Sequence, residues 1–283
     1  MTENTPLLII RASNQNDPLQ KEAFQALWQI GAWTVVPYIL QTLEEDDTLD
    51  DLAFDLLSAE EVWFFTEGNE AEYEGMIQEL LAHAEDHMAT ALYILQNALK
   101  GWWDAAMQII RTIGYPRNAP AIPIVILHAS DWNSLAQQTA FHVLQDLGPV
   151  AVAQYLINIL SGKLQGVGQW SYGIYELCFL LIALGKPYST LCGPTITYIV
   201  GRSDSAQKPG MKIALTVLEK IGPDSVTYAL PTLIDLVSRE GTSEVGKQAQ
   251  RLIQSFGEEA LEPYKLLLES IVDKPEQKGM EGQ

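Results

Sequence analysis

Six glycines stand at the ends of short amphipathic segments, and their spacing is the feature that most constrains the fold of this chain. They are Gly31, Gly114, Gly148, Gly185, Gly222 and Gly257. From Gly114 onward, successive glycines lie 34, 37, 37 and 35 residues apart. A period in this range is typical of repeated helical hairpins, each of which needs a neighbour to bury its apolar face.

The residues before each glycine repeat in kind as well as in spacing. A large aliphatic residue stands four positions before the glycine, and in five of the six cases an alanine stands eight positions before it. The two rows are Leu27, Ile110, Leu144, Leu181, Leu218 and Ile253, and Ala23, Ala106, Ala140, Leu177, Ala214 and Ala249. Small residues let a partner helix approach closely, while large ones fill the space between hairpins. We therefore predict an all-α fold, a right-handed α-solenoid of about eight helical hairpins.

The first complete unit, residues 17–43, carries a pattern that can be compared with a known family. Its order is Asp17-Pro18, then Ala23, Ala26-Leu27, Ile30-Gly31 and Pro37. This order resembles the HEAT repeat, especially the short bacterial type called phycobilisome-lyase-like. The resemblance implies an α-α superhelix over nearly the whole chain. The Arg that the family often carries near the start of the glycine-ended helix is replaced here by Ala136 and Gly246.

The domain organisation follows from the length and the composition. A chain of 283 residues that is 47% apolar is long enough for one continuous solenoid core. We expect a single domain over residues 1–272, with an acidic part at 1–100 and regular repeats over 101–272. The polar tail, residues 273–283, is expected to be disordered.

No segment is typical of a membrane span or a signal peptide. The longest apolar run, Ile174 to Leu184, is far shorter than the ~20 residues that cross a bilayer. No basic region precedes Leu7 to Ile10, as it would in a signal peptide. We expect a cytoplasmic protein with no membrane partner.

The net charge of −19 is concentrated in the first third of the chain. Sixteen acids and no base lie between Glu44 and Asp86, and residues 1–100 hold nineteen acids against three bases. Such a field repels nucleic acid and attracts a basic partner, although a solvated face that keeps the protein soluble has the same composition. The acids that we take to represent this surface are Asp46, Asp47, Asp50 and Asp51.

A second candidate surface is formed by the residues that stand three, six and ten positions before each glycine. In HEAT folds this row of residues lines the concave groove. The row is polar in most units and turns apolar in one. We expect five of its residues to contact a client protein: Trp28, His142, Tyr175, Phe179 and Ile182. The alternative is that the loop at 161–168 covers the apolar members locally.

No residue pattern indicates catalysis, a cofactor or a metal. His83 and His87 have the spacing of two ligands on one helix face, but Glu is not at the required second position and no third ligand is evident. Gly162-Lys163 has the wrong order for a phosphate loop and follows no strand. Cys178 and Cys192 lie in apolar helical segments, which favours buried reduced thiols.

The leading functional hypothesis is a non-enzymatic scaffold that binds a client protein, basic in character, through its groove or its acidic end. One alternative is a phycobilin lyase-type chaperone-enzyme or a subunit of it, which rests on the resemblance alone. Another is an inhibitor whose acidic block mimics nucleic acid.

Overall fold

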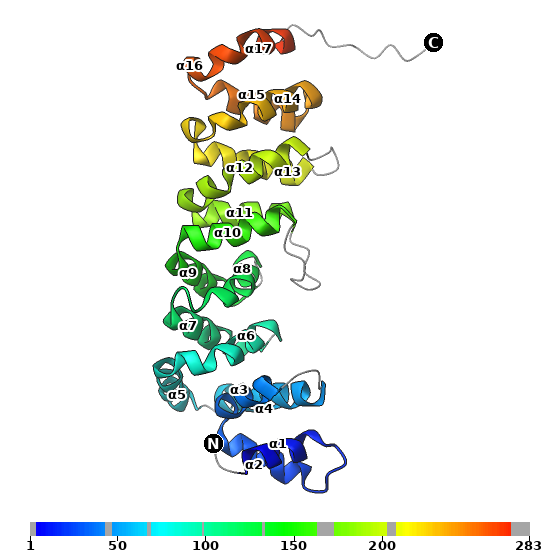
Figure 1. Ribbon diagram of the computed structural model, residues 1–283, viewed down its shortest axis with the longest axis vertical. Coiled ribbons are helices and arrows are strands. Elements are labelled where there is room, and N and C mark those ends of the chain that lie inside the picture. The colour runs from blue at the N-terminus through cyan, green and yellow to red at the C-terminus, as the bar shows by residue number, and fades with distance from the viewer. Residues whose placement is uncertain are drawn as a thin grey trace, which may run out of the picture. The chain divides into compact units, whose positions relative to one another are not determined.

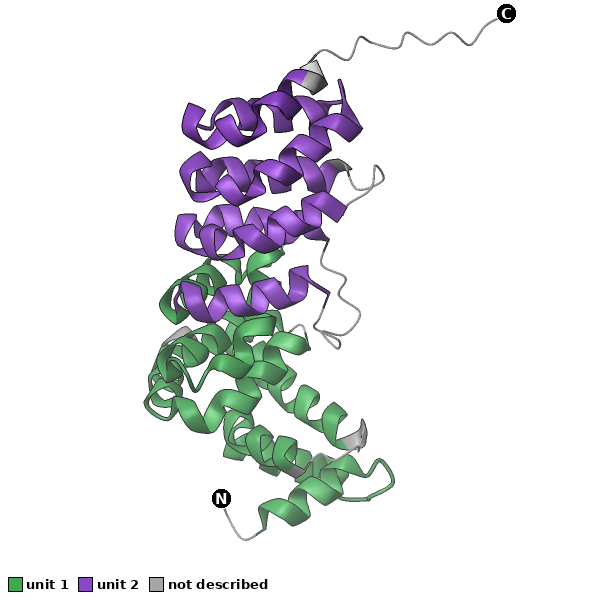
Figure 2. Ribbon diagram, turned by 45° about the horizontal axis from the view of Figure 1, so that its top comes forward, with its two compact units in different colours: residues 1–147 green, residues 148–283 purple. Residues whose placement is uncertain are grey.

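A computed structural model describes residues 4–42, 47–66, 69–97, 99–131, 134–162, 173–202 and 208–272 (Figure 1). Throughout these ranges the regular elements are helices, and no strand occurs, so the all-α prediction is confirmed. The chain divides into two compact units, residues 1–147 and residues 148–283 (Figure 2). The predicted tail at 273–283 lies outside the described residues, as does most of the loop at 161–168.

The first unit consists of α-helices, with short 3-10 helices between some of them after α5. In order, the elements are α1 (Thr5–Ser13), α2 (Gln20–Ile30), α3 (Ala32–Thr42), α4 (Asp47–Thr66), α5 (Glu70–Ala82), η1 (Ala84–His87), α6 (Met88–Gln96), η2 (Lys100–Trp102), α7 (Trp103–Ile113), η3 (Ala119–Ala121), α8 (Ile122–Ser130) and α9 (Gln137–Leu147). Among them α5, α7 and α9 contact one another in succession, and so do α3, α6 and α8.

The second unit is also built mainly of α-helices, with short 3-10 helices after α13 and α16. Its elements are α10 (Pro149–Leu160), α11 (Ile174–Leu184), α12 (Lys186–Arg202), α13 (Lys208–Ile221), η5 (Pro223–Ser225), η6 (Thr227–Ala229), α14 (Leu230–Glu240), α15 (Glu244–Gln254), α16 (Glu258–Leu261), η7 (Glu262–Tyr264) and α17 (Lys265–Val272). Here α11 contacts α13 and α13 contacts α15, while α10 contacts α12 and α12 contacts α14. Each of these helices therefore packs against the next helix but one along the chain.

The residues of the two predicted rows belong to the core of both units. Every residue that stands four or eight positions before one of the six glycines is at most 4% exposed. Five of the six glycines follow a helix with a positive φ, between 70° at Gly114 and 99° at Gly222, a conformation that a side chain would strain. Gly257 is the exception, because α15 already ends at Gln254 and Gly257 precedes α16 with φ −67°.

The helix α4 differs from the sequence prediction. The pattern predicts a helix at 48–58 that ends at Ser58, followed by a separate short helix at 60–65. The structure has a single helix of 20 residues, Asp47–Thr66. Ser58 stands where other units have glycine, and serine does not favour the positive φ that ends the other helices. The helix therefore continues through Glu60 and Glu61, both of which are half-buried.

An aromatic cluster fills the space beside this longer helix. Trp102 is fully buried and donates its Nε1–H to the carbonyl oxygen of Leu57 at 3.0 Å. Its ring meets those of Trp33 and Phe64 edge to face, with centroids 5.6 and 5.7 Å apart. Tryptophan buries a large apolar area and finds a partner for its N–H when buried. The cluster thus fixes α3 and α4 against the start of α7.

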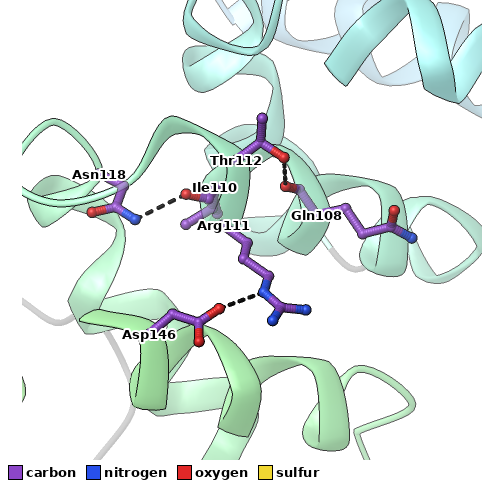
Figure 3. A network of polar contacts seen from close by, with 6 residues as sticks. All are labelled: Gln108, Ile110, Arg111, Thr112, Asn118 and Asp146. Atoms are coloured by element: carbon purple, nitrogen blue, oxygen red, sulfur yellow. Dashed lines mark hydrogen bonds and ion pairs between the residues drawn. The ribbon is translucent and has the colours of Figure 1, made fainter. Parts of the chain in front are cut away.

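Side-chain contacts join the neighbouring glycine-ended helices α7 and α9 (Figure 3). Arg111 of α7 forms an ion pair with Asp146 of α9. Asn118 donates its Nδ2–H to the carbonyl oxygen of Ile110 at 2.9 Å, which satisfies an acceptor at the end of α7. The same kind of bond recurs at two other helix ends, from Gln20 to Ala12 and from Gln137 to Ala129, each spanning eight residues.

Across the described residues, no single helix is long and apolar enough to cross a membrane. The successive helices α9 and α10 pass a test of length and composition when they are taken together as a broken pair.

Candidate functional site

One candidate site is a cavity of about 960 Å³ in the first unit. It lies among α3, α4, α5, η1 and α6, next to the Gly31 turn between α2 and α3. The described part of its lining contains no Lys or Arg. It contains four carboxylates and two imidazoles: Glu60, Glu79, Glu85, Asp86, His83 and His87.

The histidines of this cavity do not share a helix face as the sequence suggests. The helix α5 ends at Ala82, and the 3-10 helix η1 at 84–87 separates the two side chains. His83 is exposed, whereas His87 is half-buried. No group of three metal-binding side chains occurs in the described ranges.

Glu60 lies in the wall of the cavity with only one of its carboxylate oxygens partnered. It accepts a hydrogen bond from the backbone N–H of Ala32, the first residue of α3, where a carboxylate suits the helix dipole. Its Oε2 atom is buried and has no hydrogen-bond partner. Burial raises the pKa of Glu60 to about 7, although the bond from Ala32 acts in the opposite direction. The carboxyl group therefore changes its charge near neutral pH.

His87 and Trp33 form a second contact inside the cavity wall. Burial lowers the pKa of His87. The Asp86 charge and the hydrogen bond to the Trp33 carbonyl raise the pKa, but their effect is smaller. Because Nδ1 has no partner, we assign the bond to the Trp33 carbonyl to Nε2, which then carries the proton of a neutral ring. The two rings meet edge to face with centroids 6.0 Å apart. Trp33 is 3% exposed, and its Nε1–H also lacks a partner.

An acidic surface is formed by α4, α5 and η1, and three of its exposed acids, Glu79, Glu85 and Asp86, line the cavity. Its exposed carboxylates are Asp50, Asp51, Asp55, Glu72, Glu74, Glu79, Glu85 and Asp86. Arg117 forms an ion pair with Glu85. Of the predicted acids, Asp46 lies outside the described residues, and Asp47 is described only as the first residue of α4.

Two acids of α4 make contacts with distant parts of the chain. Tyr93 donates its O–H to the carbonyl oxygen of Asp50 at 2.9 Å, and burial together with the Asp50 charge raises the pKa of Tyr93. Glu61 accepts the backbone N–H of Gly101 at 3.0 Å. A Cβ at Gly101 would collide with that Glu61 side chain, so the close approach requires glycine. Through these contacts Asp50 and Glu61 contribute to the fold.

Exposed apolar side chains accompany the acids on α4. Phe54 is 40% exposed, Val62 56% and Phe65 50%. Separations of eight and eleven residues place all three on one side of the helix. The outer surface of α4 therefore combines negative charge with apolar area.

The structure separates the five predicted groove residues into different environments. Trp28 is half-buried and packs edge-on against Trp63 of α4, with centroids 6.2 Å apart, whereas His142 is exposed. Tyr175 is 43% exposed and lies against the half-buried Phe179, with centroids 4.7 Å apart. Ile182 is half-buried. Of the five, Tyr175 and Phe179 are brought into contact.

A smaller cavity of about 310 Å³ lies beside Tyr175 in the second unit. Its lining is mainly apolar and includes Ile199, Val200, Pro209 and Met211 from α12 and α13. The aromatic pair therefore adjoins further apolar surface, as a client-binding site would require.

The remaining candidates are structural. His128 is buried between Ser134 Oγ at 2.9 Å and the carbonyl oxygen of Leu95 at 3.1 Å, and its burial lowers its pKa. Cys178 and Cys192 are buried free thiols, as predicted, and burial raises the pKa of each to about 12. Such thiols stay protonated and unreactive.

Comparisons of the chain with protein-family models, with curated proteins and with solved structures found no match. The site is therefore defined by its own geometry. Sequence reasoning missed Glu60, which stood among sixteen acids without any distinguishing mark. The one available signal was its position shortly after Ser58, on a helix that continues because no glycine ends it.

Proposed function

We propose that this protein is a non-enzymatic scaffold, a HEAT-like α-solenoid, that binds a basic client protein through the acidic surface of its first unit. The observation that carries the proposal is the combination on α4 and α5 of exposed carboxylates with the exposed side chains of Phe54, Val62 and Phe65. A surface kept acidic only for solubility has no need of exposed aromatic rings.

The chemistry of this surface defines the client. Clustered carboxylates raise the rate of association with a basic partner, while desolvated apolar side chains supply most of the affinity. An amphipathic helix with a basic face and an apolar face offers both kinds of contact to α4. The proposal therefore commits to a basic amphipathic segment as the occupant.

The HEAT-like assignment is supported by the packing of helices against the next but one and by the five positive-φ glycines. In such folds the row that contains Tyr175 and Phe179 lines a groove. We assign this aromatic pair to a separate protein-binding contact of the second unit.

The test uses charge reversal at positions that have no structural partner among the contacts described above. We choose Asp51→Lys, Asp55→Lys, Glu72→Lys and Glu74→Lys, because all four side chains are exposed. Asp50 is left unchanged because of its contact with Tyr93. The probe is a synthetic helical peptide of about five turns with one lysine face and one leucine face, and the control peptide has the same composition in scrambled order.

We expect the amphipathic peptide to associate more slowly as salt rises to ~0.15 M, where the Debye length is about 8 Å. The four reversals should slow association by about tenfold or more and change dissociation less. The double variant Tyr175→Ala/Phe179→Ala is the control. It leaves the acidic surface intact and should not change the association rate of the peptide. Equal binding of both peptides by the wild type and the reversed variant would refute the acidic surface as the binding site.

A further inference from the structure

Three buried polar atoms without a hydrogen-bond partner belong to residues that line the cavity of the first unit. They are Glu60 Oε2, His87 Nδ1 and Trp33 Nε1. Nearly all buried polar atoms in folded proteins are hydrogen-bonded, so each exception needs a physical reason. Three exceptions around one cavity share a simple reason if the cavity holds a ligand when the protein is at work.

The hydrogen-bonding character of these atoms indicates the chemistry of that ligand. Glu60 Oε2 accepts, and His87 Nδ1 also accepts, because Nε2 carries the proton of the neutral ring. Two acceptors suit a group with several N–H donors. Trp33 Nε1 is a donor, and it suits a carbonyl oxygen. A basic residue within a peptide offers both kinds of group.

The charge of the cavity favours the same occupant. Glu79, Glu85 and Asp86 stand exposed at its rim, and no Lys or Arg occurs in the lining that the structure describes. Arg117 already forms an ion pair with Glu85 from within the chain. A carboxylate at the rim of the cavity therefore already binds a guanidinium group of the same chain.

The dimensions of the cavity leave room for a long side chain. A volume of about 960 Å³ lies within the range of cavities that enclose small organic ligands. The three unpartnered atoms are covered from solvent. Glu60 and His87 are nevertheless partly exposed, so rotation of these two side chains opens the inner wall to an entering group.

We propose that this cavity binds one basic residue of the client, with Glu60 and His87 accepting from its side-chain N–H groups and Trp33 donating to its main-chain carbonyl. The inference rests on the proposed function and adds to it a defined pocket for a single residue.

The experiment measures binding of N-acetyl-arginine amide and N-acetyl-lysine amide to the full chain by calorimetry. The uncharged control ligand is N-acetyl-citrulline amide, which matches arginine in shape and keeps the carbonyl groups. Glu60→Gln removes the acceptor charge at the cavity. The matched control, Glu22→Gln, removes an exposed charge of α2 that neither lines the cavity nor belongs to the acidic surface.

We expect saturable binding of at least one cationic ligand and no measurable binding of the citrulline compound. Loss of a charge-assisted hydrogen bond should weaken binding of the cationic ligand by about tenfold in Glu60→Gln, with no change in Glu22→Gln. Equal affinities in the two variants, or no saturable binding of either cation, would overturn the proposal. Near-ultraviolet circular dichroism of both variants confirms that the fold is intact.

The amphipathic lysine–leucine peptide is titrated in parallel, so that the two proposals fail separately. If it binds in a salt-sensitive way while Glu60→Gln binds the cationic ligand like the wild type, the cavity is wrong and the acidic surface stands. If the small cation binds through Glu60 and the peptide does not bind, the pocket stands and the scaffold function is wrong.

Discussion

Replacement of Glu60 by glutamine should stabilise the first unit at alkaline pH and have much less effect in acid. Burial raises the pKa of this carboxyl from 4.5 to about 7 in the folded protein. Below pH 4.5 the group is protonated in both the folded and the unfolded state and contributes nothing to pH dependence. As pH rises from 4.5 to about 7, the unfolded state loses its proton first, so wild-type stability falls.

The size of the effect follows from the shift in pKa. One pKa unit corresponds to about 1.4 kcal/mol. For a fully buried carboxyl, the shift would lower the free energy of unfolding by about 3 kcal/mol at alkaline pH. Because the side chain is partly exposed, we expect a smaller value, about 2 kcal/mol. The neutral amide introduced by Glu60→Gln keeps an oxygen that accepts the N–H of Ala32 and avoids the cost of ionisation. The free energy of unfolding of this variant relative to wild type should therefore increase by about 2 kcal/mol between about pH 5 and pH 8.

Guanidinium chloride unfolding followed by tryptophan fluorescence, at unit steps of pH across this range, measures the difference. Six of the seven tryptophans precede residue 148, so the signal reports mainly on the first unit. Glu72→Gln is the control, because it makes the same chemical change at an exposed side chain. A stability difference between Glu60→Gln and wild type that stays constant across the range would refute the assignment of a raised pKa to this carboxyl.

Two further predictions concern packing and thiol chemistry. Ala140→Leu and Ala214→Leu each place a larger side chain at a site no more than 1% exposed, and each should lower the free energy of unfolding by roughly 1–3 kcal/mol; thermal melts within error of wild type would show that these sites yield without strain. Cys178 and Cys192 should not react with Ellman's reagent in the native protein and should react fully in denaturant, because burial holds both thiols protonated. Rapid native labelling would contradict their burial.

The repeated rows made most of the helical pattern predictable from the sequence. Leu144 and Ala140 illustrate why, since their distances of four and eight residues from Gly148 place both on one face of a helix. Both are fully buried. Periodicity of this kind reports which face of a helix is buried, and it needs no knowledge of distant parts of the chain.

The cavity was not predictable, because it depends on features that break the period. The helix α4 extends past Ser58, and a 3-10 turn separates His83 from His87. Glu60 gains its raised pKa from the elements that surround it, and the other elements of the cavity are distant from it in sequence. A local pattern cannot report a property that arises from long-range burial. The aromatic pair Tyr175 and Phe179, four residues apart on one helix, was easier to anticipate because its contact is local.

The amide side chains at the helix ends limit how acidic this chain can become. Asn118, Gln20 and Gln137 each donate to a backbone carbonyl eight residues earlier, a task that a carboxylate cannot perform. Deamidation has the same consequence. When Asn118 loses its amide nitrogen and becomes Asp, a carboxylate oxygen takes the place of the N–H donor and faces the carbonyl oxygen of Ile110. Deamidation at this single buried site would set two acceptors against each other and weaken the end of α7, with no change in any residue that a client touches.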